Sequence, residues 1–232
     1  MPNDKSKLPK HVGIIMDGNR RWAKQHKLES AFKGHEYVVN QVIEELVDAC
    51  VEQGIPYLTL WAFSTENWKR SQEEVEGLMG LFRNAFAKQS EDLHKKGVRL
   101  KTIGNMSRFP KDIQEGAAHW QELSKKNTKI TVTFALNYGG RDEILRAIHR
   151  ISPEKITDIT EEEFSQLLDT SDLPDPDLII RTGGDVRTSG FMPWQATYAE
   201  YYYTSILMPD FTKQELQKAL DTFAHSTRNF GK

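Results

Sequence analysis

An acid, a glycine and two arginines stand at the end of the first apolar run of this chain. Residues 12–16 (VGIIM) have the composition of a buried strand, and Asp17, Gly18, Arg20 and Arg21 follow directly. A carboxylate can hold a divalent cation and guanidinium groups bind phosphate oxygens, so this chemistry suits a magnesium-bound diphosphate. The competing interpretation is structural, with Asp17 capping the next helix and both arginines solvated. The segment alone leaves both interpretations open.

Three further polar segments also follow strand-like apolar runs. They are residues 64–70 (STENWKR), 138–141 (YGGR) and 181–189 (RTGGDVRTS). In an open parallel sheet the carboxyl ends of the strands lie at one edge, and ligands bind there. The segments can therefore converge although they are far apart in the sequence. A site for two phosphorylated groups best accounts for five of the arginines that the strand ends supply, which are Arg20, Arg21, Arg70, Arg181 and Arg187.

Strand and helix patterns alternate along the chain, with no internal repeat. Besides 12–16, strands are expected at residues 57–63, 98–103, 129–137 and 178–180, with a last short strand at 205–208. Helical periodicity is present over residues 35–53, 75–96, 112–123, 142–151, 161–168 and 212–223. This order predicts an α/β fold. We expect a single domain over residues 1–232, with a central, mostly parallel sheet flanked by helices.

Two apolar surfaces could belong either to the core or to a ligand channel. One is a wide stripe on the helix of residues 75–86, and the other is the strand of residues 130–136, where bulky and small side chains alternate. Taken alone, both patterns favour ordinary packing between sheet and helix. Tyr198 and the aromatic residues 201–203 likewise favour packing.

The composition argues against several classes of function. A formal net charge of −2 indicates no strongly basic surface for nucleic acid. The chain lacks GxxxxGK[ST] and an opening GxGxxG, which disfavours P-loop and Rossmann nucleotide sites, and it lacks HExxH and CxxC. A strand-end aspartate can be a phosphatase nucleophile, but Asn19 occupies the place where such an enzyme needs a second acid. The single cysteine, Cys50, cannot form an internal disulfide and is expected to lie buried in a helix.

No secretory signal peptide is expected in the N-terminal segment. Residues 1–9 are polar, are expected to be flexible, and lack the apolar stretch of a signal peptide. No run approaches the ~20 apolar residues that a membrane span requires. We therefore expect a soluble, cytoplasmic protein.

Five motifs, taken together and in order, resemble the cis-prenyltransferases. Undecaprenyl diphosphate synthase of the bacterial cell-wall pathway is the best-known member of that family, and the resemblance covers almost the whole chain. The motifs are MDGNRRWA at 16–23, GH at 34–35, YLTLWAFSTENWKR at 57–70, NYGGR at 137–141 and LIIRTGGDVRTSGFMPWQATYAEYYYT at 178–204.

The resemblance implies an undecaprenyl diphosphate synthase-like homodimer with an apolar tunnel between sheet and helices. The implied reaction is cis-prenyl chain elongation, in which isopentenyl diphosphate condenses with an allylic diphosphate, expected to be farnesyl diphosphate. Mg²⁺ is the only cofactor implied. The expected product is a polyprenyl diphosphate, the undecaprenyl carrier lipid of cell-wall synthesis, with peripheral membrane contact for its release. No nucleic acid partner is expected.

The resemblance also implies roles for individual residues. Asp17 is implied to bind Mg²⁺ and to be the residue on which catalysis depends most, Asn67 to organise proton removal, and Glu200 to be a second metal-associated acid near the dimer interface. The allylic diphosphate is assigned to Gly18, Asn19, Arg20 and Arg21 with help from His35, and isopentenyl diphosphate to Arg181, Arg187 and Ser189. The remaining substrate-binding residues are Trp22, Ser64, Trp68 and Arg70, of which Trp68 and Arg70 lie with Asn67 on a loop implied to close over the substrates.

Several positions depart from the family pattern. An arginine that often precedes the GH pair is absent from residues 29–33, where Lys33 is a candidate substitute. Asp185 stands where glutamate is usual, Gly190 where asparagine is common, and Ser71 where proline is frequent. The alternative function is a non-catalytic partner subunit or lipid-binding protein of the same fold. Such partners tend to lose the strand-end acid and the arginine clusters, and this chain keeps both.

Overall fold

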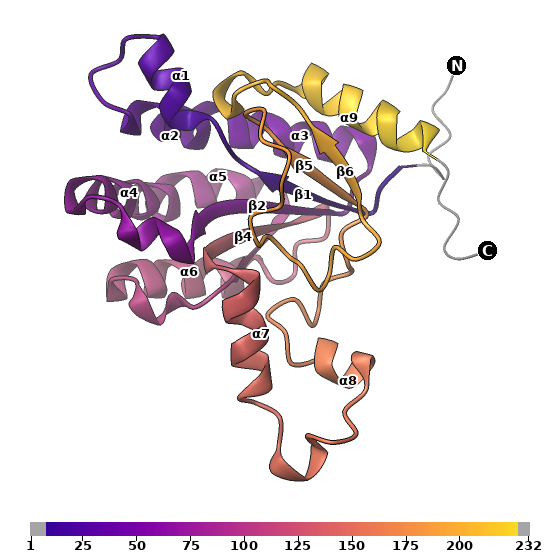
Figure 1. Ribbon diagram of the computed structural model, residues 1–232. Helices are drawn as coiled ribbons and strands as arrows, with labels where there is room; N and C mark the ends of the chain where they lie inside the picture. Colours follow the sequence, from indigo (N-terminus) through magenta and orange to yellow (C-terminus); the bar gives the residue numbers. More distant parts are fainter. Residues whose placement is uncertain (1–7, 227–232) are drawn as a thin grey trace.

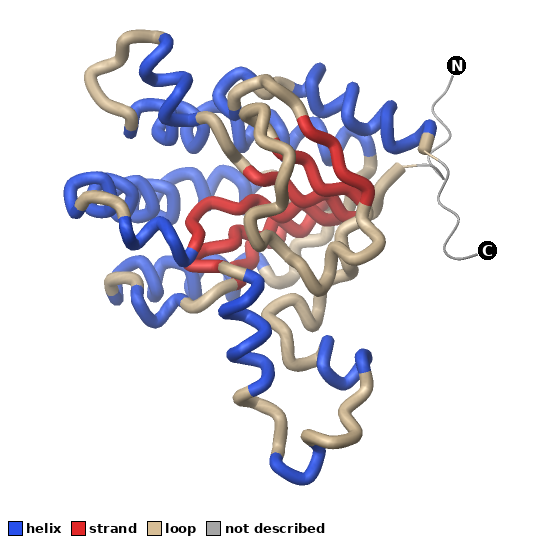
Figure 2. Tube along the Cα trace, in the orientation of Figure 1, coloured by secondary structure: helices blue, strands red, loops and turns tan. Residues whose placement is uncertain are grey.

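A parallel sheet runs through the centre of the molecule, with helices packed on it (Figures 1 and 2). The computed structural model describes residues 8–226, so the expected flexible N-terminus of residues 1–9 lies outside the described residues except for its last two. The strand order is β3-β4-β2-β1-β5-β6, and every neighbouring pair is parallel. The strands are β1 (His11–Ile15), β2 (Tyr57–Ser64), β3 (Val98–Ile103), β4 (Ile130–Tyr138), β5 (Leu178–Arg181) and β6 (Glu200–Tyr203).

The helices form a layer around the sheet, apart from α7 and α8, which project away from it (Figure 1). The α-helices are α1 (Asn19–Gln25), α2 (Phe32–Tyr37), α3 (Ile43–Gln53), α4 (Gln72–Asn84), α5 (Ser90–Lys95), α6 (Lys111–Ser124), α7 (Gly140–Ile148), α8 (Glu161–Ser165) and α9 (Lys213–His225). Two π-helical turns, η2 (Val38–Val42) and η4 (Ala85–Gln89), join α2 to α3 and α4 to α5. The short 3₁₀ turns are η3 (Thr65–Lys69), η5 (Met106–Arg108), η6 (Pro153–Lys155) and η7 (Met208–Asp210).

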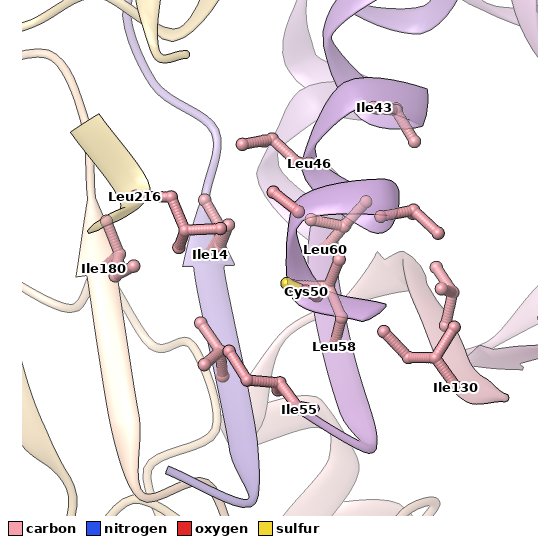
Figure 3. Close-up of a cluster of buried hydrophobic side chains, with 14 of the residues drawn as sticks. Ile14, Ile43, Leu46, Cys50, Ile55, Leu58, Leu60, Ile130, Ile180 and Leu216 are labelled. Atoms are coloured by element: carbon pink, nitrogen blue, oxygen red, sulfur yellow. The ribbon is translucent and has the colours of Figure 1, made fainter. Parts of the chain in front are cut away.

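Alternate residues of the central strands serve two different cores. Ile14 of β1 packs in the larger core with α3 and α9, where Leu46 and Leu216 are almost fully buried (Figure 3). The next residue, Ile15, points to the opposite face and packs with Phe191 of the loop before β6. Because both faces are covered, the central strands are rich in apolar residues on both faces. This burial fixes the sheet and thereby the positions of its strand ends.

The structure confirms the predicted α/β fold, and most of the predicted elements lie within a few residues of their expected bounds. The last strand is an exception, because it is Glu200–Tyr203 and not residues 205–208. Residues 205–208 instead close over two other strand ends: the Ile206 carbonyl accepts a hydrogen bond from Gly183 N–H (2.7 Å), and Met208 N–H donates to the Asp17 carbonyl (3.0 Å). This apolar segment therefore supports the polar site instead of extending the sheet.

His11 is a buried hydrogen-bonding link at the opposite end of β1. Its Nδ1 lies 2.6 Å from the Pro174 carbonyl, to which it must donate, and its Nε2 lies 2.8 Å from the Thr59 hydroxyl. Burial lowers the pKa of His11 to about 4, although the Pro174 contact and nearby Asp177 oppose that change. The folded protein therefore holds this imidazole neutral.

We predict acid sensitivity from this histidine. An unfolded chain binds the proton near pH 6.5 and the folded protein near pH 4, so stability is full above pH 6.5 and is lost as the pH falls between these values. The loss from His11 amounts to roughly 3 kcal/mol. Urea unfolding at pH 7.5 and 4.5 measures it, and His11→Gln should reduce the difference by about that amount. An equal pH dependence in wild type and variant would contradict this assignment.

Candidate active site

Two cavities meet at the carboxyl ends of the strands. One is apolar, has a volume of about 450 Å³ and lies between the sheet and the helices, with Phe82, Phe134 and Leu136 among its walls. The other is polar, measures about 660 Å³ and is bordered by residues 16–21 and 28–31. The residues common to both linings are Met16, Asp17, Asn19, His35 and Arg70. The arrangement suits a ligand with a charged head and an apolar tail.

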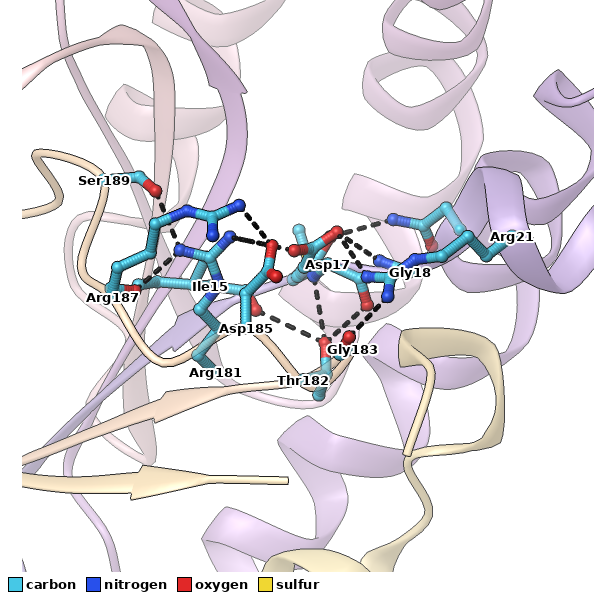
Figure 4. A network of polar contacts seen from close by, with 12 residues as sticks. Ile15, Asp17, Gly18, Arg21, Arg181, Thr182, Gly183, Asp185, Arg187 and Ser189 are labelled. Atoms are coloured by element: carbon cyan, nitrogen blue, oxygen red, sulfur yellow. Dashed lines mark hydrogen bonds and ion pairs between the residues drawn. The ribbon is translucent and has the colours of Figure 1, made fainter. Parts of the chain in front are cut away.

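Asp17 connects the end of β1 to the end of β5. Its Oδ1 accepts hydrogen bonds from Gly18 N–H (2.6 Å) and from Arg21 (3.2 Å), and its Oδ2 accepts one from Arg181 (2.9 Å) (Figure 4). Its backbone is held by the Thr182 hydroxyl, which lies 2.9 Å from the Asp17 nitrogen and 2.7 Å from its carbonyl oxygen. The parallel pairing of Ile15 with Arg181 places these two ends side by side.

The charge state of Asp17 follows from this environment. Burial by itself raises the pKa of the carboxyl, but the hydrogen bond and positive charge of Arg181 outweigh burial, with Arg21 and the Gly18 N–H adding to them. The net effect is a pKa below its ordinary value. Asp17 is therefore a carboxylate at neutral pH, as a ligand of a divalent cation must be.

Arg181 is the most constrained of the arginines. Its side chain is only 6% exposed and is shared between Asp17 and Asp185, whose Oδ2 lies 3.1 Å away. It also donates to the Arg187 carbonyl (2.6 Å) and to the Ser189 hydroxyl (2.8 Å). Its buried Nε has no hydrogen-bond partner in the described structure. Asp185 also pairs with Arg187, which is 61% exposed, so one buried and one exposed guanidinium surround the same acid.

Close backbone packing holds the polar loops in place. A Cβ on Gly183, whose φ is +86°, would lie 2.5 Å from Arg21 and 3.1 Å from the Asp17 backbone. A Cβ on Gly34 would lie 2.1 Å from the Asn19 carbonyl oxygen. Gly183 allows the loop after β5 to approach the loop after β1, and Gly34 allows helix α2 to approach the start of α1. The neighbouring His35 is thereby placed in both cavities.

His35 and Asn19 present buried atoms without partners to the cavities. Neither His35 Nδ1 nor Asn19 Oδ1 has a hydrogen-bond partner among residues 8–226. Burial, together with the positive charge of Arg70, lowers the pKa of His35 to about 4. His35 is therefore neutral at pH 7. Unpaired buried polar atoms are costly, so their presence in a cavity indicates contacts that a ligand completes.

The segment after β2 forms a further wall of the site. Ser64 and Asn67 form a capping box in which the Ser64 N–H donates to the Asn67 side-chain oxygen at 3.0 Å. Arg70 donates to Glu74 Oε1 at 2.7 Å, and Arg20 lies 3.9 Å from the same oxygen. Glu74 thus holds together two arginines from different strand ends. Ser64, Asn67 and Arg70 all line the apolar cavity.

Three residues to which the resemblance assigns a role in the site line neither the polar nor the apolar cavity. Trp22 is buried, stacks on Tyr37 (4.9 Å between ring centroids) and donates to Asp210. Trp68 packs on Phe63 and Phe109 and donates to Asn137 at 2.8 Å, so it anchors the loop and does not line either of the two cavities. Glu200 pairs with Leu178 at the amino end of β5, away from the strand end that carries Asp17.

The structure also shows site residues that the sequence interpretation did not single out. Thr182 is fully buried and holds the Asp17 backbone, and its position directly after a strand could have indicated this. Lys24 lines the polar cavity one helical turn beyond Arg20 and Arg21, a spacing that was readable from the sequence. Lys33, the candidate substitute for the absent arginine, does not line that cavity and pairs with Glu36 at 2.7 Å.

Comparisons with known proteins identify the family. A family model described as "Putative undecaprenyl diphosphate synthase" matches residues 15–231. The chain is 44% identical over 225 residues to an isoprenyl transferase of Neisseria meningitidis, covering 97% of this chain and 90% of that protein. The chain belongs to this family. An isoprenyl transferase of Aquifex aeolicus is likewise 44% identical over 226 residues, with 97% of each chain covered.

Solved structures of the family share the fold. A lavandulyl diphosphate synthase from Lavandula x intermedia, in complex with dimethylallyl diphosphate, superposes with a TM-score of 0.93 at 34% identity, covering 98% of this chain and all of the other. A probable undecaprenyl diphosphate synthase from Campylobacter jejuni gives 0.82 at 35% identity, with 97% and 99% covered. Membership of this family makes the chain a prenyltransferase, which acts in cis-prenyl chain elongation.

Proposed function

We propose that this protein condenses isopentenyl diphosphate with an allylic diphosphate, farnesyl diphosphate being the expected primer, in a Mg²⁺-dependent reaction. The expected product is a polyprenyl diphosphate that serves as the undecaprenyl carrier of cell-wall synthesis. The observation that carries the proposal is the junction of the polar and apolar cavities at Asp17, Asn19, His35 and Arg70. The family member solved with dimethylallyl diphosphate supports an allylic diphosphate as ligand.

The two diphosphates are assigned to the two sides of Asp17. Gly18, Asn19, Arg20 and Arg21 border the polar cavity and would bind the allylic diphosphate, together with His35. The group of Arg181, Arg187 and Ser189 would bind isopentenyl diphosphate, since Arg187 is exposed and Arg181 lies beside Asp17. Bidentate guanidinium groups are well matched to phosphate oxygens.

The chain's own residues can promote the reaction by stabilising charge. As the bond from the allylic carbon to the diphosphate oxygen breaks, negative charge grows on the leaving group, and Arg20, Arg21 and Arg70 can neutralise it. The carbon becomes cationic and is attacked by the double bond of isopentenyl diphosphate, after which a proton leaves the new chain. Asn67 is fixed at the cavity wall by the Ser64 N–H, and we assign it the organisation of that proton removal.

The donor set around Asp17 fits Mg²⁺. Mg²⁺ prefers one or two carboxylates combined with substrate phosphates, and the described residues contain no cluster of three acidic, histidine or cysteine side chains that could hold an ion alone. Asp17 supplies a carboxylate, and Asn19 Oδ1 is a buried oxygen without a partner. A bound Mg²⁺ would supply charge neutralisation of the departing diphosphate. Asp17, with Asn19 beside it, would hold the ion.

The proposal includes a homodimer and a role for Glu200. In the described sheet β6 is an edge strand, and Tyr198 and Tyr201 beside it are 74% and 40% exposed. A second copy packed on this edge would cover these rings and would place Glu200 near the dimer interface, where it would act as the second metal-associated acid.

None of the helices in residues 8–226 has the length and apolar composition to span a membrane. Cytoplasmic activity with peripheral membrane contact for product release completes the proposal.

Incubation with radiolabelled isopentenyl diphosphate, farnesyl diphosphate and Mg²⁺ tests the reaction. Labelled prenyl product should form and should be lost when EDTA is added. Mass photometry of the same preparation should show a dimer. If no labelled product forms with any short allylic diphosphate, the alternative of a non-catalytic partner subunit or lipid-binding protein replaces this proposal. Product that persists in EDTA would remove Mg²⁺ from it.

A further inference from the structure

The outer walls of the apolar cavity are two helical segments that are both interrupted by a π-helical turn. In one, η2 lies between α2 and α3, and Val38 and Val39 of this turn line the cavity. In the other, η4 lies between α4 and α5, and Phe86 and Gln89 line the cavity. A π-helical turn inserts a residue and is frequent at functional sites. Both turns occur where the helical segments border the cavity.

A side-chain hydrogen bond joins the two π-helical turns. Gln89 Nε2 donates to Asn40 Oδ1 at 2.8 Å, and Asn40 is exposed, so the contact lies on the outer side of the cavity. The other end of the Gln89 amide, Oε1, is buried and has no hydrogen-bond partner among the described residues. Gln89 thus forms the Asn40–Gln89 bridge with one atom and places an unpaired acceptor at the cavity wall with the other.

Beyond this bridge the same two helical segments are clamped by charge. Lys96, just after α5, lies 2.7 Å from Glu44 and 2.6 Å from Asp48, both on α3. Ser90 and Leu93, between the bridge and this clamp, are the last residues of α5 that line the cavity. The end of the cavity remote from Asp17 is therefore closed by contacts between the two segments.

The volume of the cavity makes this closure relevant to a growing chain. A protein cavity of about 150 Å³ accommodates benzene, which has six carbon atoms. By that measure the cavity of about 450 Å³ holds an apolar chain of roughly 18 carbon atoms. A longer chain must separate the two helical segments or leave between them. The contacts that hold the segments together then oppose growth.

We propose that the Asn40–Gln89 bridge limits the length of the prenyl chain that this enzyme makes. The inference rests on the proposed function, because it assigns the apolar cavity to the growing chain. A chain that reaches Gln89 would cover its unpaired oxygen with hydrocarbon, which is unfavourable, and a chain too long for the cavity would have to break the hydrogen bond to Asn40 in order to separate the two segments. Gln89 and Asn40 touch no reacting atom, so they act on product length and not on the chemical step.

Four variants test the bridge separately from its surroundings. Asn40→Ala removes the acceptor on an exposed side chain, and Gln89→Met removes both the donor and the unpaired oxygen at similar size. Asn40→Asp keeps an acceptor for Gln89 Nε2 and is the conservative control. Lys88→Ala changes an exposed neighbour in the same π-helical turn. Each is incubated with labelled isopentenyl diphosphate, farnesyl diphosphate and Mg²⁺, and the products are separated by chain length.

We expect Asn40→Ala and Gln89→Met to lengthen the most abundant product by at least one five-carbon unit, with Gln89→Met having the larger effect. For Asn40→Ala, whose exposed side chain does not line the cavity, the rate of the first condensation should stay within twofold of wild type. Asn40→Asp and Lys88→Ala should give the wild-type product distribution. Unchanged or shorter products from folded Asn40→Ala and Gln89→Met would overturn the inference while leaving the proposed function intact. A wild-type protein that makes no prenyl product would overturn the proposed function itself.

Discussion

Asp17→Asn is expected to reduce prenyl transfer by about 10³-fold or more while leaving the protein folded. The substitution keeps the size of the side chain but removes its negative charge, which Arg21 and Arg181 contact at 3.2 and 2.9 Å. It removes the carboxylate proposed to hold Mg²⁺ and breaks the connection between the two proposed diphosphate sites. Arg181 retains Asp185 as a partner, so the fold should survive. Initial rates at saturating substrates and Mg²⁺ measure the effect.

A surface acid provides the control for Asp17. Asp112 also pairs with an arginine, Arg83, but the pair lies on the exposed side of α4 and α6. Asp112→Asn should leave the rate within twofold of wild type, because an exposed ion pair contributes little. If Asp17→Asn retained more than a tenth of the wild-type rate, Asp17 would lose its assigned role. Thermal unfolding of both variants shows whether any loss of rate reflects loss of structure.

The sequence was sufficient to predict the parallel sheet and the convergence of its ends. Buried strands in such a sheet are continuous apolar runs, so residues 57–63 and 178–180 were recognisable without any structure. Once the strands are parallel, Asp17 and Arg181 must lie at the same edge, and they do so in adjacent strands. This part of the site follows from the parallel arrangement of the strands, and the strands themselves can be predicted from local composition.

The packing contacts of individual aromatic residues could not be predicted from the sequence. Trp68 lies in a segment of site residues, yet its ring packs on Phe63 and on Phe109, and Phe109 is distant in the sequence and becomes a neighbour only in the fold. The π-helical turn η4 was also hidden, because the apolar stripe of residues 75–86 continues into it with ordinary helical spacing. Side-chain direction and helix irregularity depend on tertiary packing, which periodicity does not encode.

Arg181→Met should lower both the stability of the protein and its rate of prenyl transfer. The buried guanidinium separates two carboxylates, and without it Asp17 and Asp185 face each other while the Arg187 carbonyl and Ser189 hydroxyl lose a donor. We expect the free energy of unfolding to fall by about 3 kcal/mol at pH 7. We also expect kcat/KM for isopentenyl diphosphate to fall by about 100-fold or more. Urea unfolding and steady-state kinetics give the two values.

Arg187→Met is the matched control for Arg181→Met. Arg187 is 61% exposed, so its loss should raise the KM for isopentenyl diphosphate but change stability by less than about 0.5 kcal/mol.

Arg181 lowers the pKa of Asp17 below 3.8, so the stabilisation that it provides through this carboxylate is present above that pH and is lost as the pH falls below it. The stability difference between wild type and Arg181→Met should therefore narrow below about pH 4. A difference that stayed constant there would mean that Arg181 stabilises the fold by packing and not through its charge.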